Sequence, residues 1–208
     1  LTGTENALKQ DGPTSASGAF SPSRLLMFDL ATGQAAAQYV YNVDPVVVPP
    51  TGGNFAVGGL VEMLTLGPDS YLAMERSYTV GAPGTGYDIK LYQFSLNGAT
   101  DVSSLSSLAG ASYVPVQKTL LYDLGTLGIR LDNVEGMTFG PTLADGRRSL
   151  VLVADDNFSL AINGPGSAPQ NTQFLVFAAS AAPEPGALGL MALGMIPGAI
   201  ALIRRRQD

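Results

Sequence analysis

The sequence predicts an all-β chain, a partial β-propeller of about three antiparallel blades followed by one C-terminal transmembrane helix. Three observations predict this fold: short apolar runs separated by turn residues, an internal repeat, and an uncharged apolar run near the end of the 208 residues. The expected division is a propeller fragment over residues 1–180, a linker over 181–185, a transmembrane helix over 186–203 and a basic cytoplasmic end over 204–208.

The apolar runs carry the all-β prediction because each is short enough for a strand and is bounded by turn pairs such as Asp11-Gly12 and Asn97-Gly98. No long stretch of helical period precedes the tail, although residues 102–108 also fit a helical turn. The expected strands are 25–30, 59–66, 70–74, 89–96, 114–124, 134–139, 149–154 and 174–178.

The repeat carries the propeller prediction. Residues 61–68 match residues 134–141 at Val, Glu, Thr, Gly and Pro, and each copy leads into a second and a third apolar strand. Residues 4–6 and 24–30 supply the second and third strands once more, with the first strand expected upstream of a chain that opens without Met. Three small antiparallel units that cannot each bury their own face favour stacked blades, with a β-sandwich as the alternative.

The C-terminal tail combines a Pro-Glu-Pro tripeptide, 18 uncharged residues at 186–203 and an Arg cluster. As a helix, this run would rise about 27 Å, close to the thickness of a bilayer core, and the Arg cluster predicts a cytoplasmic end. A plain single-span anchor is one interpretation. The order of the three features also resembles the PEP-CTERM sorting signal of Gram-negative bacteria, here Pro183, Glu184, Pro185, Arg204, Arg205 and Arg206.

That resemblance implies export, processing near the tripeptide by an exosortase-type membrane enzyme, and a link to exopolysaccharide. We therefore expect the protein to be anchored in the inner membrane before processing and to reach the cell surface or the medium afterwards.

The composition excludes several kinds of partner and site. The formal net charge is −6, so nucleic acid is not an expected partner, because phosphate binding needs clustered Lys and Arg. The chain has no Cys and no His, which excludes disulfides, thiolate metal sites and the commonest general base from this sequence.

The repeat also aligns acidic residues. If equivalent positions of successive blades converge around one axis, these acids ring a shared opening, where like charges repel by roughly 1 to 4 kcal/mol per pair at about 4 Å. Pairing with Arg76 or a bound divalent cation would offset that repulsion. The aligned acids are Glu62 with Glu135 in the first strand, and Glu5, Glu75 and Asp156 at the end of the second.

Oxygen ligands alone suit Ca²⁺ or Mg²⁺ better than zinc. The expected metal ligands are Glu5, Glu62, Glu135, Asp155, Asp156 and Asn157. The alternative for the Asp155-Asp156-Asn157 run is an ordinary solvated turn held by Asx hydrogen bonds.

Residues 4–8, 73–78 and 133–141, together with 150–158, resemble the phytase-like family, which is described as having esterase-like activity of phytase. The likeness spans nearly all of residues 1–180 and corresponds to the C-terminal half of that domain. It implies a propeller and a metal-assisted phosphoester or ester hydrolase, with Glu75, Arg76 and Glu135 as the catalytic candidates. The sequence departs from propeller phytases because it has no dense Lys/Arg cluster for a polyphosphorylated substrate.

A second class of function fits the same residues. A non-catalytic surface propeller would use the acids to bind structural calcium, carbohydrate or matrix components. Hydrolysis of small ester and phosphoester substrates, with and without chelator, separates the two hypotheses.

Overall fold

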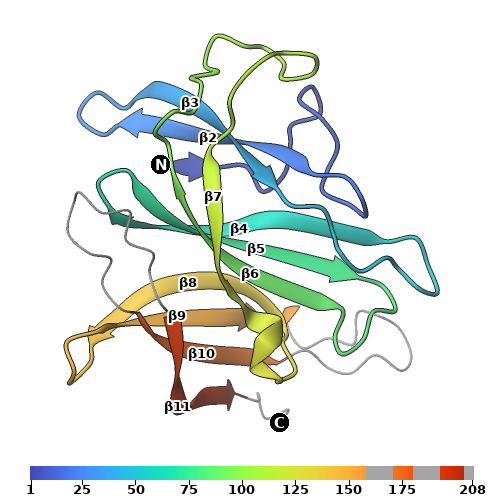
Figure 1. Ribbon diagram of the computed structural model, residues 1–208, viewed down its shortest axis with the longest axis vertical. Helices are drawn as coiled ribbons and strands as arrows, with labels where there is room; N and C mark the ends of the chain where they lie inside the picture. Colours follow the sequence, from blue (N-terminus) through green and yellow to red (C-terminus); the bar gives the residue numbers. More distant parts are fainter. Residues whose placement is uncertain (158–170, 180–192, 204–208) are drawn as a thin grey trace.

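The computed structural model describes residues 1–157, 171–179 and 193–203, the last of these as backbone only. This part of the chain is all-β and forms three antiparallel sheets (Figure 1). Sheet 1 contains β1 (Thr2–Gly3), β2 (Ser21–Asp29) and β3 (Gln34–Val43). Sheet 2 contains β4 (Ala56–Gly67), β5 (Ser70–Thr79), β6 (Tyr87–Ser95) and β7 (Gln117–Asp123), and is followed by the 3₁₀ turn η1 (Leu124–Leu127). Sheet 3 contains β8 (Asn133–Thr142), β9 (Arg148–Asp155), β10 (Thr172–Ala179) and β11 (Leu193–Ile203).

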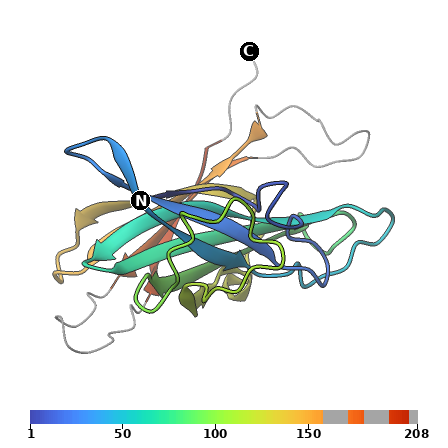
Figure 2. The same ribbon diagram turned by 90° about the horizontal axis from the view of Figure 1, so that it is seen from above.

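Within each sheet, strands that are consecutive in the chain are neighbours, so each sheet is a simple up-and-down meander. The two sets of repeated strands predicted from the sequence are β4-β5-β6 and β8-β9-β10, which confirms the repeat at the level of whole strands. Figure 1 shows the three sheets in chain order along the long axis, and Figure 2 shows that they overlie one another.

Two apolar cores join the sheets. Leu25 and Tyr41 of sheet 1 pack with Ala73 of sheet 2, whereas Leu72 and Met74 pack with residues of sheet 3. Because side chains alternate along a strand, β5 sends its odd-numbered residues toward sheet 1 and its even-numbered residues toward sheet 3. Burial on both faces explains why β5 reads as a continuous apolar run rather than an alternating one.

A β-bulge changes the predicted alignment of the repeat. The β4–β5 pairing shifts between Leu60 and Glu62, and the β8–β9 pairing shifts between Val134 and Gly136, so Glu135 is the extra residue of its bulge. Leu60 packs toward sheet 1 as Val134 packs toward sheet 2.

The structural counterpart of Glu62 is therefore Gly136, and the predicted equivalence of Glu62 with Glu135 is wrong by one residue. A slip of one residue moves a side chain to the opposite face of its sheet, so Glu62 and Glu135 do not occupy equivalent places.

The C-terminal segment also differs from the prediction. Residues 193–203, expected as part of a helix, form β11 and pair with β10 in antiparallel register. An open sheet edge offers unpaired N–H and C=O groups that an apolar segment can satisfy as a strand, and apolar character alone does not distinguish strand from helix. Within the described ranges, no helix has the length and apolar character needed to cross a membrane. Residues 186–192, the Pro-Glu-Pro tripeptide and the Arg cluster lie outside those ranges.

One long connection ties sheet 2 to sheet 1. Residues 97–116, between β6 and β7, cross to β3, where the Val102 N–H donates to Gln38 O at 2.8 Å and the Val116 N–H donates to Val40 O at 2.8 Å. Leu108, like Val102, is buried against Val40. We call this segment the strap.

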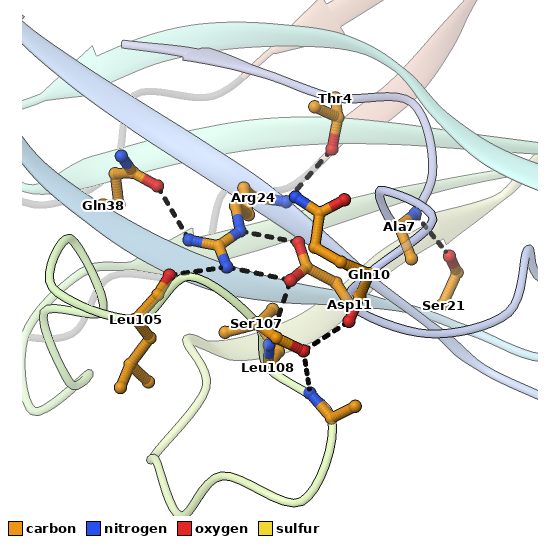
Figure 3. Close-up of polar contacts among 11 residues, drawn as sticks. Thr4, Ala7, Gln10, Asp11, Ser21, Arg24, Gln38, Leu105, Ser107 and Leu108 are labelled. Atoms are coloured by element: carbon orange, nitrogen blue, oxygen red, sulfur yellow. Dashed lines mark hydrogen bonds and ion pairs between the residues drawn. The ribbon is translucent and has the colours of Figure 1, made fainter.

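A buried ion pair fixes the strap to the N-terminal loop (Figure 3). Arg24 donates to both carboxylate oxygens of Asp11, at 2.6 and 2.8 Å, and also to Gln38 Oε1 and Leu105 O at 3.0 Å. The Leu108 N–H donates to Asp11 Oδ1 at 3.0 Å. Burial of both side chains is nearly complete, with exposed fractions of 6% for Arg24 and 0% for Asp11. Four of the five Arg24 donors are used, so the cluster is structural.

Candidate functional site

The predicted catalytic residue Arg76 lies where the three sheets meet. Its side chain projects from β5 toward β8, and its Nη2 donates a hydrogen bond to Glu135 Oε1. The same nitrogen lies 3.7 Å from Glu5 Oε1, in the loop that follows β1. The structure thus brings together three of the predicted site residues, and it offsets the repulsion of two carboxylates by pairing them with one guanidinium.

The position of Glu5 depends on Gly59. The Leu60 N–H donates to the main-chain O of Glu5 at 2.9 Å, and Gly59 stands opposite Arg76 in the β4–β5 ladder. A Cβ placed on Gly59 would lie 2.5 Å from Glu5 Oε1, which is closer than real contacts allow. A residue without a side chain at position 59 lets the Glu5 carboxylate cross β4 and reach Arg76.

One donor of Arg76 lacks a partner among the residues that the structure describes. Its Nε is buried and makes no hydrogen bond to them, although the Arg76 side chain as a whole is 14% exposed. An unpaired buried donor costs about 1 to 3 kcal/mol, and more on a charged group. Such groups merit explanation, and a ligand oxygen is one acceptor that would relieve the cost.

A small cleft opens beside Arg76, at the end of the seam between sheets 1 and 2. Its polar lining includes two cations and three carboxylates. The lining residues are Val43, Asp44, Pro45, Val47, Gly58, Gly59, Glu75, Arg76, Ser77, Asp88, Lys90 and Tyr92. Lys90 forms an ion pair with Asp88 and lies 3.9 Å from Asp123.

Glu75, predicted as catalytic, points to the opposite face of β5 from Arg76 and is 7% exposed. Its Oε1 accepts hydrogen bonds from Tyr41 Oη at 2.7 Å and from Lys118, and its Oε2 accepts the Asp44 N–H at 2.9 Å. Burial raises the pKa of Glu75, while Lys118 opposes that rise. With both oxygens occupied, Glu75 has the environment of a structural ion pair, and its catalytic role stays a prediction.

Lys118 was not among the predicted site residues. Its Nζ lies 2.8 Å from Asp44 Oδ1, 4.9 Å from the centre of the Tyr41 ring and 4.4 Å from that of Tyr92. Tyr92 donates from its hydroxyl to Asp44 Oδ2 at 2.7 Å. Burial is the largest cause that raises the pKa of Tyr92, and the hydrogen bond to Asp44 raises it further. No local motif marks Lys118, because its partners come from other strands.

The predicted metal ligands are divided among separate places. Glu5 and Glu135 meet at Arg76, whereas Glu62 accepts the N–H of Met63 at 2.9 Å. In residues 1–157, 171–179 and 193–203, no three acidic side chains gather in a way that could hold a metal ion.

The acidic run at the end of β9 has the geometry of an Asx turn. Asp155 Oδ1 accepts the N–H of Asn157 at 2.9 Å, and Asn157 has a φ of 46°. Asp156 accepts a hydrogen bond from Thr172 Oγ1 at 3.0 Å. The Asx turn agrees with the turn alternative for this run, although Asp156 itself is buried rather than solvated. The calcium site stays a prediction.

Comparison with known protein families matches residues 1–158 to the family described as "Phytase-like: Esterase-like activity of phytase". Searches of curated proteins and of solved structures find no significant match. The matched range contains sheets 1 and 2 and the first two strands of sheet 3, and therefore Glu5, Arg76, Glu135 and the cleft that Arg76 lines. The chain belongs to the phytase-like family.

Proposed function

We propose that this chain is part of an exported β-propeller hydrolase that cleaves a small ester or phosphoester at the Arg76 cleft. The observation that carries the proposal is the unpaired, buried Nε of Arg76 on the wall of a cleft, next to two carboxylates, in a member of the phytase-like family.

The propeller arrangement is supported by the relation between neighbouring sheets. Sheets 2 and 3 have the same strand order, and their first strands, β4 and β8, lie beside each other. In a propeller the first strands line the central axis and the sheets follow one another around it. Glu5 and Glu135 would then lie near that axis.

The proposed chemistry uses Arg76 and one neighbouring carboxylate. Glu135, whose side chain is 34% exposed, would take a proton from water as the water oxygen attacks the ester carbon or phosphorus. The bond to the leaving alkoxide would break, and that proton would pass to the alkoxide. Arg76 would stabilise the negative charge that develops on the acyl or phosphoryl oxygen.

The charges around the cleft favour an ester with little or no negative charge. Arg76 and Lys90 are each already paired with carboxylates, and so is Lys118 behind the cleft wall. A polyphosphorylated substrate would have to compete with these carboxylates for every cation and would meet their repulsion. A neutral or singly charged ester would not.

Calcium dependence is a separate part of the proposal and comes from the family resemblance. No step above passes through a metal, because Arg76 rather than a metal holds Glu5 and Glu135 together. The oxygen-only donors at Asp155, Asp156 and Asn157 would suit Ca²⁺ only if other groups joined them.

The test is hydrolysis of p-nitrophenyl acetate and p-nitrophenyl phosphate by the full-length protein, with EDTA and with Ca²⁺. Arg76→Gln is expected to lower kcat/KM by about 100-fold, the effect of removing one oxyanion donor. Arg147→Gln is the matched control, because Arg147 pairs with Asp145 in an exposed turn. Glu135→Gln is expected to act like Arg76→Gln.

Equal activity of Arg76→Gln and Arg147→Gln would overturn the active-site assignment. Loss of activity in EDTA with recovery in Ca²⁺ would support the calcium part. If neither substrate is turned over while Ca²⁺ raises Tm, the protein is instead a non-catalytic propeller that binds calcium, carbohydrate or matrix.

We also propose export and sorting through the C-terminal tail, with processing by an exosortase-type enzyme and a link to exopolysaccharide. The proposal rests on the order of the tripeptide at 183–185, the apolar run and the Arg cluster at 204–206. Replacing all three residues of the tripeptide by Ala is expected to leave the protein unprocessed in the inner-membrane fraction, as judged by gel mobility after fractionation. Unchanged processing would reject the tripeptide as a signal.

A further inference from the structure

The cleft that Arg76 lines has an apolar wall on one side. Val43, at the end of β3, forms this wall together with Pro45 and Val47, which belong to the loop that follows β3. Val43 is completely buried, whereas Val47 is 73% exposed, so the wall extends from the core to solvent. Exposed apolar surface in a concave site is surface that a bound ligand can remove from water, which favours binding.

The wall that sheet 2 contributes to the same cleft is polar. It includes Ser77 of β5 and the pair Asp88 and Lys90 of β6. Asp88 and Lys90 form an ion pair, and their side chains keep exposed fractions of 31% and 21%. An alkyl chain laid against this wall would take water from both charges and return no hydrogen bond, which is unfavourable. The cleft therefore has one side suited to an alkyl group and one side suited to the polar part of a ligand.

The backbone holds Val47 in its exposed position. On one side of it, the Val46 N–H donates to Ala16 O at 3.1 Å, and Val46 is itself buried. On the other side, Val48 O accepts a hydrogen bond from Thr79 Oγ1 at 3.1 Å. Because both neighbours of Val47 are bonded to other segments, its side chain cannot turn into the core without breaking these bonds. A preformed apolar surface of this kind binds a ligand with little loss of conformational entropy.

We infer that the Val47 wall binds the acyl chain of the substrate, which makes the substrate an ester of a short-chain, apolar carboxylic acid. The inference rests on the proposed hydrolysis at the Arg76 cleft and names the substrate class for it. During hydrolysis of an ester, negative charge develops on the acyl oxygen and on the leaving oxygen, whereas none develops on the acyl chain. The two oxygens are therefore better placed near Arg76 and Lys90, and the chain near Val47.

The test compares p-nitrophenyl acetate, propionate and butyrate as substrates of the full-length protein. We expect kcat/KM to rise about 4-fold for each added methylene, the effect of burying one CH₂ group, and hence about 15-fold from acetate to butyrate. Val47→Ser removes apolar surface from the wall and is expected to lower the butyrate-to-acetate ratio of kcat/KM at least about 5-fold. Val114→Ser is the matched control and should keep the ratio, because Val114 is 50% exposed in the strap and does not line the cleft.

A binding measurement separates failure of this inference from failure of the proposed hydrolysis. Methyl acetate and methyl butyrate are titrated into the Arg76→Gln protein and into the same protein with Val47→Ser added, and Kd is obtained from NMR chemical shifts. The first protein is expected to bind methyl butyrate about 15-fold more tightly than methyl acetate, and the second to lose most of that preference. If no ester is hydrolysed but this preference is found, the hydrolase proposal fails and the acyl-binding wall stands.

Three results would overturn the inference. Equal kcat/KM for acetate and butyrate would do so while leaving hydrolysis at Arg76 intact. A butyrate preference that Val47→Ser does not change would place the acyl chain on another surface. Absence of both turnover and a binding preference would overturn this inference together with the proposed hydrolysis.

Discussion

Two arginine–carboxylate clusters of this protein use the same chemical groups in opposite ways. Arg24 donates to Asp11 through two nitrogens and to two further acceptors, and both side chains are almost completely buried. Arg76 meets Glu135 and Glu5 through a single nitrogen and leaves its Nε unpaired, beside carboxylates that are 34% and 54% exposed.

The difference gives a criterion for telling a charged side chain that only stabilises this fold from one that can bind a ligand. The Arg24 guanidinium uses four of its five N–H donors on three segments of the chain, and both partners of the ion pair are buried. The Arg76 cluster has a buried donor without a partner among the described residues, on a residue that lines a cleft, and two partly exposed carboxylates. Completeness of hydrogen bonding, rather than the presence of an ion pair, marks which of them can act on a substrate.

The largest expected effect comes from breaking the Arg24 cluster. Asp11→Ala leaves the buried guanidinium without its carboxylate and is expected to lower the free energy of unfolding by about 3 to 5 kcal/mol. Urea denaturation followed by tyrosine fluorescence measures it. Asp145→Ala, which breaks an exposed pair with Arg147, is the control and should leave stability unchanged. If Asp11→Ala lowered the free energy of unfolding by much less than 3 kcal/mol, the Arg24 cluster would not be the more strongly stabilising of the two.

A smaller loss of stability is expected from a substitution of Lys118. Its partner Glu75 is buried like Asp11, but Glu75 keeps other hydrogen-bond donors when Lys118 is removed. Lys118→Met removes the cation beside buried Glu75, but Tyr41 and the Asp44 N–H still satisfy the carboxylate. We expect a loss of about 2 kcal/mol, measured in the same way, with exposed Lys9→Met as control. A loss as large as that of Asp11→Ala would mean that Lys118 alone stabilises the charge of Glu75.

Gly59→Ala tests the looser cluster directly. The added Cβ would push the Glu5 carboxylate away from Arg76, and because Glu5 is half-exposed it can move at a cost of about 1 kcal/mol. Gly67→Ala, in the same strand but with open space around it, is the matched control. In a double-mutant cycle Gly59→Ala and Glu5→Ala should be strongly non-additive. Additive losses would show that Gly59 does not position Glu5.

The smallest effects concern pH. Arg24 lowers the pKa of Asp11 below its ordinary value, so the stability from that carboxylate is present above about pH 4 and is lost as pH falls through the lowered pKa. Burial raises the pKa of Glu75, so the stability of its protonated form is present below pH 4.5 and is lost as pH rises through the raised pKa.

Thermal melts from pH 2 to pH 8 separate these two carboxylates. Asp11→Asn should flatten only the acid side of the plot of Tm against pH. Glu75→Gln should remove only the decrease of Tm above pH 4.5. If both variants flattened the same side, the two environments would not differ as described.

Strand β2 and strands β4 to β10 could be predicted from the sequence, because apolar runs, turn residues and the repeat are local signals. Strand β3 was not among the predicted strands. The predicted convergence of acidic strand ends is only partly present. Glu5 and Glu135 meet at Arg76, which was predicted as their pairing partner. Glu75 faces the opposite side of β5, and Asp156 bonds to Thr172 instead. The alignment of Glu62 with Glu135 failed because a bulge changes the facing of side chains without leaving a local sequence signal.

The role of Lys118 and the strand at 193–203 could not be predicted, because both depend on partners far away in the sequence. Lys118 contacts Glu75, Asp44 and two tyrosine rings, all of which lie far from it in the sequence. The residues next to Lys118 give no signal of these contacts. The strand at 193–203 depended on whether an apolar segment meets a sheet edge or a bilayer, which is a property of its surroundings and not of its residues.

The strap over residues 97–116 also bears on how such a chain can be recombined. Repeated units usually duplicate or exchange as independent modules, because each touches its neighbour only through one interface. Here a segment that belongs to sheet 2 supplies hydrogen-bond partners inside sheet 1, including one for Arg24. We therefore expect sheets 1 and 2 to be exchangeable only together, because a chimaera that replaced one without the other would remove an acceptor of the buried Arg24 guanidinium.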